Sequence, residues 1–494
     1  MSILSIDAGT TGITVLVVST SGAILSRGYQ EFNQHFPKSG WVEHDPEEIW
    51  QATLSATAAA LSGSTDAPTA IGITNQRETV VLWDKDTLKP ARRAIVWQDR
   101  RTSNLVVELR NSGVEASVIE KTGLGLDPYF SSTKFLWLAQ KEPEIWEAVK
   151  SGQVLIGTVD SYLIARISGG QFHITDASNA SRTQLLNIDT GEWDEQLLEM
   201  FKVPRSALPE VVSSYGKLAK SDPASFLGLS IPITGVAGDQ QAALFGQAAF
   251  EVGENKCTYG TGAFILSNTG ANRVTSSRGL LTTIAWKEPT GKTFYALEGS
   301  VFIAGAAVQW LRDGLEIIET APEVESLALS VKDSNGVVFV PALTGLGAPY
   351  WDPYARGTIF GLTRGTTKAH IARATLEAVA FQVRDVVDAI SQDTQNALTA
   401  LHVDGGAASN DLLMQLQANT LGIPVIRGKN LESTGLGAAF LAGIGSGIWS
   451  TRAELKSIFE LDRTFSPVAF DQWQYVNWKR AVNISRGWAH QGEG

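Results

Sequence analysis

The stretch that decides the fold reads Ile231-Pro232-Ile233-Thr234-Gly235-Val236-Ala237-Gly238-Asp239-Gln240-Gln241 and continues into Ala242-Ala243-Leu244-Phe245. An apolar run punctuated by glycines predicts a buried strand, and the residues after it predict a helix. Asp239 therefore stands where a strand gives way to a helix. Two interpretations are open: Asp is among the best N-cap residues, and open α/β sheets bind ligands at the carboxyl ends of strands, where an aspartate can be catalytic. This stretch alone favours the cap.

Strands and helices alternate through the first half of the chain. Strands are expected at residues 3–7, 13–19, 71–74, 80–83, 94–97 and 154–157. Asp45-Pro46 opens a helix, with Asp as the N-cap and Pro at the first helical position, and another helix follows from Asp160. Such alternation is typical of α/β layers. Arg77 and Glu78, adjacent between two strands, are either a surface ion pair or a donor and an acceptor for a polar ligand.

A second set of elements follows the central stretch. We expect a strand–loop–strand at 257–266, a helix at about 300–311, a strand at 337–340, a long helix from 370 to about 390, a strand at 401–404 and a helix beginning at Ala408. The uncharged, Gly-rich stretch 433–451 predicts a helix packed closely on a neighbour and is a poor membrane span.

Gly- and Thr-rich hairpins open both halves, and they suggest one coarse duplication. The first is Asp7-Ala8-Gly9-Thr10-Thr11-Gly12 and the second is Tyr259-Gly260-Thr261-Gly262. Backbone N–H groups and hydroxyls in such loops can cradle a phosphate without lysine, and the Gly-Lys-Ser/Thr ending of a Walker loop is absent. Gly405-Gly406 after a strand lets backbone approach a flat ligand such as adenine. Singly these are ordinary turns; together they favour a nucleotide cleft between two duplicated domains.

Composition narrows the class of protein. The chain has 494 residues, 40 Lys plus Arg, 51 Asp plus Glu and a net charge of −11. At ~150 residues per domain this length predicts about two to four domains. The acidic balance argues against nucleic acid or an anionic membrane as a partner. A single cysteine, Cys257, excludes an internal disulfide, and the start of the chain has no signal peptide, so a cytoplasmic location is expected.

Six longer segments carry a resemblance to a known family. They are Gly40-Trp41-Val42-Glu43-His44-Asp45-Pro46, Gly72-Ile73-Thr74-Asn75-Gln76-Arg77-Glu78-Thr79, Ala94-Ile95-Val96-Trp97-Gln98, Asp127-Pro128-Tyr129-Phe130-Ser131, Gly238 to Gly246, and Gly345-Leu346-Gly347-Ala348-Pro349-Tyr350-Trp351-Asp352-Pro353. These segments resemble the glycerol kinase family, part of the sugar kinases built on the actin, hexokinase and Hsp70 ATPase fold. Two general signatures of the sugar kinases also fit, at residues 129–137 with Lys134 and at 357–377. The resemblance runs from about Ile3 to Trp488.

The resemblance implies a fold and an activity. The fold would be α/β, with two duplicated ribonuclease-H-like (actin-like ATPase) domains and a cleft between them. The N-terminal kinase domain would cover residues 1–248 and the C-terminal one residues 249–494. The reaction would be ATP-dependent phosphorylation of glycerol to sn-glycerol 3-phosphate in glycerol catabolism, with Mg²⁺. A homodimer or homotetramer is expected, without nucleic acid and without membrane insertion.

The resemblance also implies residue roles on the glycerol side. Glycerol hydroxyls would be bound by Arg77, Glu78, Tyr129, Asp239 and Gln240, and the carbons would lie against Trp97 and Phe264. A site that pairs each hydroxyl rejects analogues lacking one. Asp239 would be the general base. Asp7 would orient Mg²⁺, with Asp239 near the same ion, since Mg²⁺ takes one or two carboxylates beside waters and phosphates.

On the nucleotide side, the implied contacts come from both halves. They are Thr10, Thr11, Gly12 and Thr14 in the first hairpin, Thr261 and Gly262 in the second, Gly305 and Gln309 near the phosphates and ribose, and Gly406 and Asn410 at the adenosine. Closure of the two domains would expel water and limit ATP hydrolysis.

The first hairpin departs from the family pattern. The family usually reads Asp-Gln-Gly-Thr-Thr-Ser-Ser-Arg, whereas this chain has Thr14 where the arginine would meet the ATP phosphates. Lower phosphate affinity or turnover is the expected consequence. The altered loop also keeps open a kinase for another polyol or ketose, of the xylulose or erythritol type. A catalytically silent nucleotide-binding regulator is a third possibility, against which the presence of both Asp7 and Asp239 argues.

Overall fold

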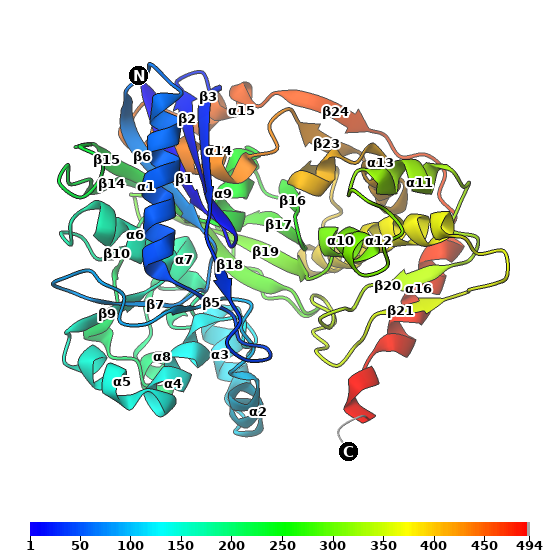
Figure 1. The fold of residues 1–494 in the computed structure, drawn as a ribbon, viewed down its shortest axis with the longest axis horizontal. Coiled ribbons are helices and arrows are strands. Elements are labelled where there is room, and N and C mark those ends of the chain that lie inside the picture. The colour runs from blue at the N-terminus through cyan, green and yellow to red at the C-terminus, as the bar shows by residue number, and fades with distance from the viewer. Residues whose placement is uncertain (492–494) are drawn as a thin grey trace.

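Two mixed sheets, joined by central helices, make up the computed structural model of residues 1–491 (Figure 1). Residues 492–494, the end of the predicted C-terminal half, lie outside the described residues. Within residues 1–491, no helix is both long and apolar enough to cross a membrane.

The N-terminal sheet has six strands in the order β14-β15-β6-β1-β2-β3. Their bounds are β1 Ser2–Ala8, β2 Gly12–Ser19, β3 Ile24–Glu31, β6 Pro68–Asn75, β14 Tyr215–Lys220 and β15 Pro232–Gly238. β1 is antiparallel to β2 and parallel to β6, which is in turn parallel to β15. In this register Ala8, Asn75 and Gly238 are aligned across the three parallel strands. The residues that follow each strand are therefore brought to one edge of the sheet.

The C-terminal sheet repeats this topology in seven strands, in the order β18-β19-β17-β16-β22-β23-β24. Their bounds are β16 Asn255–Tyr259, β17 Ala263–Gly270, β18 Leu281–Lys287, β19 Thr293–Val301, β22 Leu401–Asp404, β23 Val425–Gly428 and β24 Leu461–Phe465. β19, β17 and β16 form an antiparallel run, and β22 and β23 continue parallel to β16. The order β3-β2-β1-β6-β15 thus recurs as β19-β17-β16-β22-β23, and the predicted duplication is confirmed.

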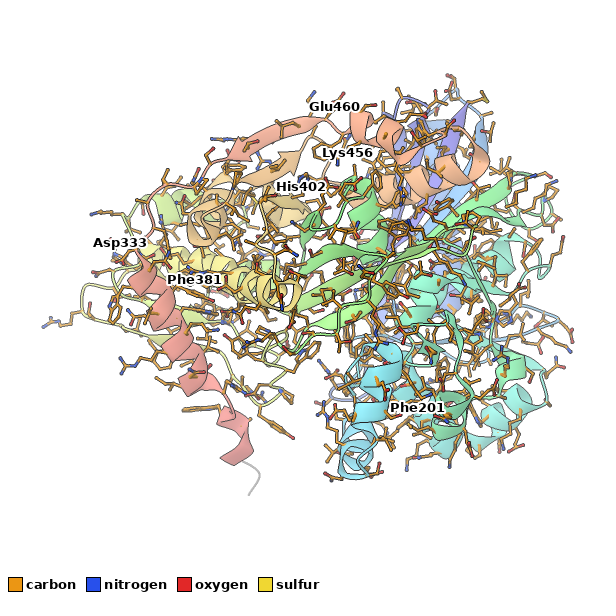
Figure 2. The ribbon with its side chains drawn as sticks, turned by 180° about the vertical axis from the view of Figure 1, so that it is seen from behind. Phe201, Asp333, Phe381, His402, Lys456 and Glu460 are labelled. Carbon is orange, nitrogen blue, oxygen red and sulfur yellow. The ribbon has the colours of Figure 1, made fainter. Side chains whose placement is uncertain are left out.

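Helices cover the faces of both sheets. The main ones are α1 Pro46–Ser62, α6 Val159–Ile167, α9 Asp239–Gly246, α10 Gly305–Asp313, α12 Lys368–Thr394, α13 Asp411–Leu421, α14 Ser433–Ser446 and α16 Gln472–Ser485. The predicted cap of α1 is confirmed, because Asp45 Oδ1 accepts the backbone N–H of Glu47 at 2.9 Å. Phe381 of α12, labelled in Figure 2, packs on Trp478 of α16 with ring centroids 5.8 Å apart.

Smaller elements connect these layers. The helices are α2 Ser103–Asn111, α3 Glu115–Thr122, α4 Ser131–Lys141, α5 Pro143–Lys150, α7 Ala177–Ser181, α8 Glu195–Met200, α11 Glu323–Leu329 and α15 Arg452–Ile458. The short strands are β4 Gln34–His35, β5 Glu43–His44, β7 Val81–Asp84, β8 Ala94–Ile95, β9 Val154–Gly157, β10 Ile174–Asp176, β11 Leu186–Asn187, β12 Glu192–Trp193, β13 Glu210–Val212, β20 Val338–Val340 and β21 Thr358–Phe360.

The Gly-rich helix α14 crosses back from the C-terminal part of the chain to the N-terminal sheet and packs on α9 (Figure 1). A Cβ at Gly437 would lie 1.7 Å from the carbonyl oxygen of Ala242 on α9. A Cβ at Gly72 on β6 would lie 2.1 Å from the carbonyl oxygen of Ala438. Only glycine permits backbones to approach this closely. The predicted close packing of this helix is confirmed, although the helix ends at Ser446 instead of extending to 451.

Three expected elements differ from the structure. Residues 300–301 belong to β19 rather than to a helix, because Ser300 and Val301 pair with Phe264 and Ala263 of β17. The helix expected from Ala408 is a short 3₁₀ turn, Gly406–Ser409, followed by α13. The strand expected at 94–97 ends at Ile95.

Candidate active site

The residue after β15 is not a helix cap. Gly238 occupies the N-cap position of α9 and Asp239 is the first helical residue. The cap interpretation of Asp239 is therefore wrong, and its carboxylate is available for other contacts. Asp239 Oδ1 accepts the backbone N–H of Gln240 at 2.7 Å and forms an ion pair with Arg77 Nε at 3.0 Å. Within residues 1–491, no donor is bonded to Oδ2, which leaves that oxygen free to take a proton.

Arg77 lies two residues beyond β6, at the sheet edge that carries Asp239. Its side chain is buried, so the interpretation as a surface ion pair with Glu78 is wrong. The two terminal nitrogens pair with both carboxylate oxygens of Glu298, at 2.6 and 3.0 Å. Arg77 Nη2 also donates to the Tyr129 hydroxyl at 3.4 Å. One guanidinium therefore joins Asp239, Tyr129 and a strand of the other sheet.

Glu298 and Arg182 are functional candidates that sequence reasoning missed. Glu298 lies on β19, is fully buried and accepts from Arg182 Nη2 at 3.1 Å as well as from Arg77. Burial acts to raise the pKa of Glu298, but the guanidiniums of Arg182 and Arg77 outweigh it and lower the pKa to about 2. The sequence feature that could have identified Glu298 is an acidic residue inside the apolar strand Tyr295-Ala296-Leu297-Glu298. A charge buried in such a strand requires a partner of opposite charge.

Glu78 is held by the same cluster in an unusual backbone conformation. Its φ is 63°, in the left-handed region that non-glycine residues seldom adopt. Its Oε1 accepts from Arg182 Nε at 2.7 Å and lies 4.0 Å from Arg77 Nε. Burial raises the pKa of Glu78 despite the opposing charges of Arg77 and Arg182. Strained backbone of this kind is typical of residues whose side chains must point at a ligand.

Aromatic side chains lie beside this polar cluster. The Trp97 ring meets Tyr129 edge-on at 5.5 Å between centroids and Phe264 at 6.3 Å. The segment that carries Tyr129 is held by buried Lys134, whose Nζ donates to the carbonyls of Pro128, Tyr129 and Phe130 at 2.7, 2.7 and 3.0 Å. The structure thus brings all three aromatic residues predicted for the substrate site together with Arg77.

The two Gly/Thr hairpins are built alike. A Cβ at Gly12 would lie 2.9 Å from the carbonyl oxygen of Gln30 on β3, and one at Gly262 would lie 2.4 Å from that of Val301 on β19. β3 and β19 occupy equivalent places in the two sheets, so each hairpin needs glycine for the same reason. Such hairpins present N–H groups and hydroxyls outward, as a phosphate cradle requires.

The first hairpin is connected directly to the aromatic residues. Trp97 Nε1 donates to Thr10 Oγ1 at 3.0 Å. Thr11 is exposed at the tip of the turn. Thr14 is buried on β2 directly opposite Asp7 and, on its other side, opposite Tyr29. Cross-strand partners share one face of a sheet, so Thr14 stands beside Asp7.

The second hairpin packs on the start of α10. The backbone N–H groups of Ala304 and Gly305 donate to the carbonyls of Thr261 and Gly260 at 2.9 and 3.0 Å. A Cβ at Gly305 would lie 2.5 Å from the Gly260 carbonyl oxygen. Gln309, one turn along α10, is exposed. Three of the predicted nucleotide residues, Thr261, Gly262 and Gly305, therefore lie together, with Gln309 beyond them on the same helix.

Gly406 and Asn410 flank the 3₁₀ turn after β22. A Cβ at Gly405 would lie 2.6 Å from the Tyr259 carbonyl oxygen, which places this turn against the second hairpin. A Cβ at Gly406 would meet nothing within 4 Å, so this glycine faces open space. Asn410 Oδ1 caps α13 by accepting from Leu413 N at 2.8 Å. Asn410 thus has a structural role in addition to the predicted one.

Asp7 and Asp239 are the predicted ligands of Mg²⁺. Burial, then the carboxylates of Asp239 and Glu432, raise the pKa of Asp7 well above its ordinary value. Within the described part of the chain, no hydrogen-bond donor reaches the Asp7 carboxylate, and no three His, Cys, Asp or Glu side chains surround one position. The Asp7 carboxylate and the Oδ2 of Asp239, neither of which has a donor among the described residues, fit a Mg²⁺ ion that completes its octahedron with waters and phosphate oxygens.

Comparisons with known proteins identify the family to which this chain belongs. Residues 2–246 match the N-terminal domain, and residues 255–446 the C-terminal domain, of the FGGY family of carbohydrate kinases. The chain belongs to this family. A glycerol kinase of Citrifermentans bemidjiense is 52% identical over 98% of this chain and 99% of its own length. The structure of Plasmodium falciparum glycerol kinase with ADP has a TM-score of 0.89 at 38% identity and covers 98% of both chains.

Other carbohydrate kinases share the fold at lower identity. A ligand-bound xylulose kinase from Lactobacillus acidophilus has a TM-score of 0.86 at 24% identity and covers 98% of this chain and 96% of its own. Likeness at that level shows the fold alone. The actin-like two-domain α/β fold expected from the sequence is confirmed for this carbohydrate kinase.

Proposed function

We propose that this carbohydrate kinase transfers the terminal phosphoryl group of ATP to glycerol and forms sn-glycerol 3-phosphate. The observation that carries the proposal is the convergence of the five residues predicted to bind glycerol: Arg77, Glu78, Asp239 and Gln240 follow neighbouring strands at one sheet edge, and Tyr129 contacts Arg77 there. Relatives named glycerol kinase at 50–52% identity over nearly the whole chain support glycerol over other substrates. The xylulose or erythritol alternative is not favoured.

The residue roles follow from the chemistry of each group. A glycerol hydroxyl donates its proton to the free Oδ2 of Asp239 while its oxygen attacks the phosphorus, so Asp239 acts as general base. Arg77 anchors that carboxylate through Oδ1 at 3.0 Å and leaves Oδ2 toward substrate. Glu78 accepts from a second hydroxyl. Trp97 and Phe264 pack on the carbon chain and exclude water.

The nucleotide lies between the two halves, which we propose act as domains 1–248 and 249–494. Thr10, Thr11 and Gly12 on one side, and Thr261 and Gly262 on the other, donate to the phosphate oxygens. Gly406 leaves room for the adenosine. Asp7 and Asp239 would hold Mg²⁺, which neutralises phosphate charge when bound. A homodimer or homotetramer and a cytoplasmic location stay predictions, to be tested by size-exclusion chromatography and cell fractionation.

A coupled ADP-release assay tests this function. Glycerol, dihydroxyacetone, glyceraldehyde, erythritol and xylulose are compared at equal concentration with ATP and Mg²⁺. The proposal expects the highest kcat/KM with glycerol. A tetritol or ketose preferred tenfold over glycerol would contradict it, and a chain that binds ATP without turning over any polyol would be a regulator instead of an enzyme.

A further inference from the structure

Lys256 on β16 is a fully buried lysine with no carboxylate within ion-pair distance among residues 1–491. Its Nζ donates instead to three neutral oxygens, namely Gln240 Oε1, Thr258 Oγ1 at 2.9 Å and the Phe264 carbonyl at 3.2 Å. Three acceptors match the three N–H groups of an ammonium. Burial lowers the pKa of Lys256, and the carboxylates of Asp404 and Asp239 oppose that effect. Two of the three acceptors belong to predicted glycerol contacts, Gln240 and Phe264.

The ammonium determines which way the Gln240 amide points. An ammonium can only donate, so the amide oxygen must face Lys256 and the amide nitrogen must face away. Within the described residues, no acceptor is bonded to that nitrogen, although only 6% of the residue is exposed. The same residue donates its backbone N–H to Asp239 Oδ1 at 2.7 Å. An amide donor on a largely buried side chain, without an acceptor among the described residues, therefore lies beside the proposed base.

We propose that Lys256 is a positioning residue that makes Gln240 a hydrogen-bond donor to one hydroxyl oxygen of the polyol. This inference deepens the proposed function and rests on it. It assigns a direction to the contacts: Arg77 and Gln240 donate, whereas Glu78 and Asp239 accept. The hydroxyl at Gln240 must accept a hydrogen bond, so a substrate with hydrogen at that carbon leaves the Gln240 N–H unpaired and is discriminated against.

Kinetics of the Lys256→Met variant test the proposal with three substrates. These are glycerol, 1,2-propanediol and 1,3-propanediol, so that a terminal or the central hydroxyl is missing in turn. Methionine keeps the length of the side chain but lets the Gln240 amide rotate. We expect KM for glycerol to rise about tenfold, the equivalent of one net hydrogen bond of about 1.4 kcal/mol. We expect KM for ATP to be unchanged and kcat to fall by less than about threefold.

The analogues separate positioning from general damage. For the diol that lacks the hydroxyl bound by Gln240, the Lys256→Met substitution should leave KM within about twofold of the unsubstituted chain. An equal rise in KM for all three substrates, or an unchanged KM for glycerol, would overturn the proposal. Lys217→Met, at an exposed lysine, is the matched control and should alter no constant.

A second variant keeps the test decisive if Lys256→Met does not fold. Gln240→Glu retains an oxygen for Lys256 but has no side-chain N–H, so KM for glycerol should rise about tenfold or more while the fold is preserved. An unchanged KM would refute the donor role. Failure of the proposed function looks different: the unsubstituted chain would not phosphorylate glycerol, and the two variants would then be assayed on the polyol that it does prefer.

Discussion

Neutralising Glu298 is the sharpest test of how the two halves share the substrate site. In the Glu298→Gln variant, the guanidinium of Arg77 loses its bidentate partner at 2.6 and 3.0 Å, and Arg182 loses an acceptor at 3.1 Å. Both guanidiniums remain buried. Removing one member of such a cluster leaves charge in a poorly solvated interior, which is strongly destabilising.

The pKa of Glu298 gives the size of the expected loss in folding stability. It falls from 4.5 to about 2 in the folded chain, which at about 1.4 kcal/mol per pKa unit corresponds to about 3 kcal/mol of stability. Because the folded pKa is the lower one, this stability is fully present above pH 4.5 and is lost as the pH falls through about 2. At pH 7 the variant should therefore be about 3 kcal/mol less stable, and the difference should shrink below pH 4.5.

Urea unfolding followed by tryptophan fluorescence measures this difference, and steady-state kinetics measure its effect on the site. Because Arg77 contacts Asp239 and Tyr129, KM for glycerol should rise at least about tenfold with little change in KM for ATP. Glu254→Gln is the control, since Glu254 forms an ion pair at a partly exposed position with Lys456, which is labelled in Figure 2. Its loss should cost under about 1 kcal/mol. An unchanged KM for glycerol in the Glu298→Gln variant would refute the argument.

Three further predictions address the base, the metal and the packing. Asp239→Asn should reduce kcat at least about 100-fold with ATP affinity retained in calorimetry, and an active Asn variant would refute the base assignment. Asp7→Asn should raise the Mg²⁺ concentration needed for half-maximal activity about tenfold without changing glycerol affinity; an unaltered Mg²⁺ titration would exclude Asp7 as a ligand. Gly437→Ala places a Cβ 1.7 Å from the Ala242 carbonyl oxygen and should destabilise the chain by about 1–3 kcal/mol. Gly125→Ala, with 3.8 Å to its nearest atom, should unfold at the same urea concentration as the unsubstituted chain.

Local patterns predicted the two hairpins, the alternating layers and the transition from strand to helix at Asp239, because strand period and turn chemistry are encoded over a few residues. The charge cluster could not be predicted this way. The bond from Arg77 to Glu298 joins residues 221 apart in sequence, and no local rule connects an arginine after β6 with a glutamate inside β19. The partner of Glu298 is set by the arrangement of the two sheets.

Two local predictions failed for reasons of tertiary structure. Asp239 has the composition of an N-cap, yet Gly238 takes that position and Asp239 is drawn to Arg77 at 3.0 Å. The helix expected from Ser300 begins five residues later, because pairing with β17 extends β19 to Val301. In both cases a contact made from another element overrides the local preference.

The return of α14 to the N-terminal sheet constrains how the protein is made. α14 covers one face of the N-terminal sheet, which includes Gly72, Ile3 and Leu16. All strands of this sheet have been synthesised once translation passes Gly238 at the end of β15. Its cover arrives only when Ser446 has left the ribosome, about 200 residues and, at about 5–20 residues per second, about 10–40 seconds later. During that interval this apolar face of the sheet lacks its covering helix, and exposed apolar surface of this kind favours aggregation of incompletely folded chains.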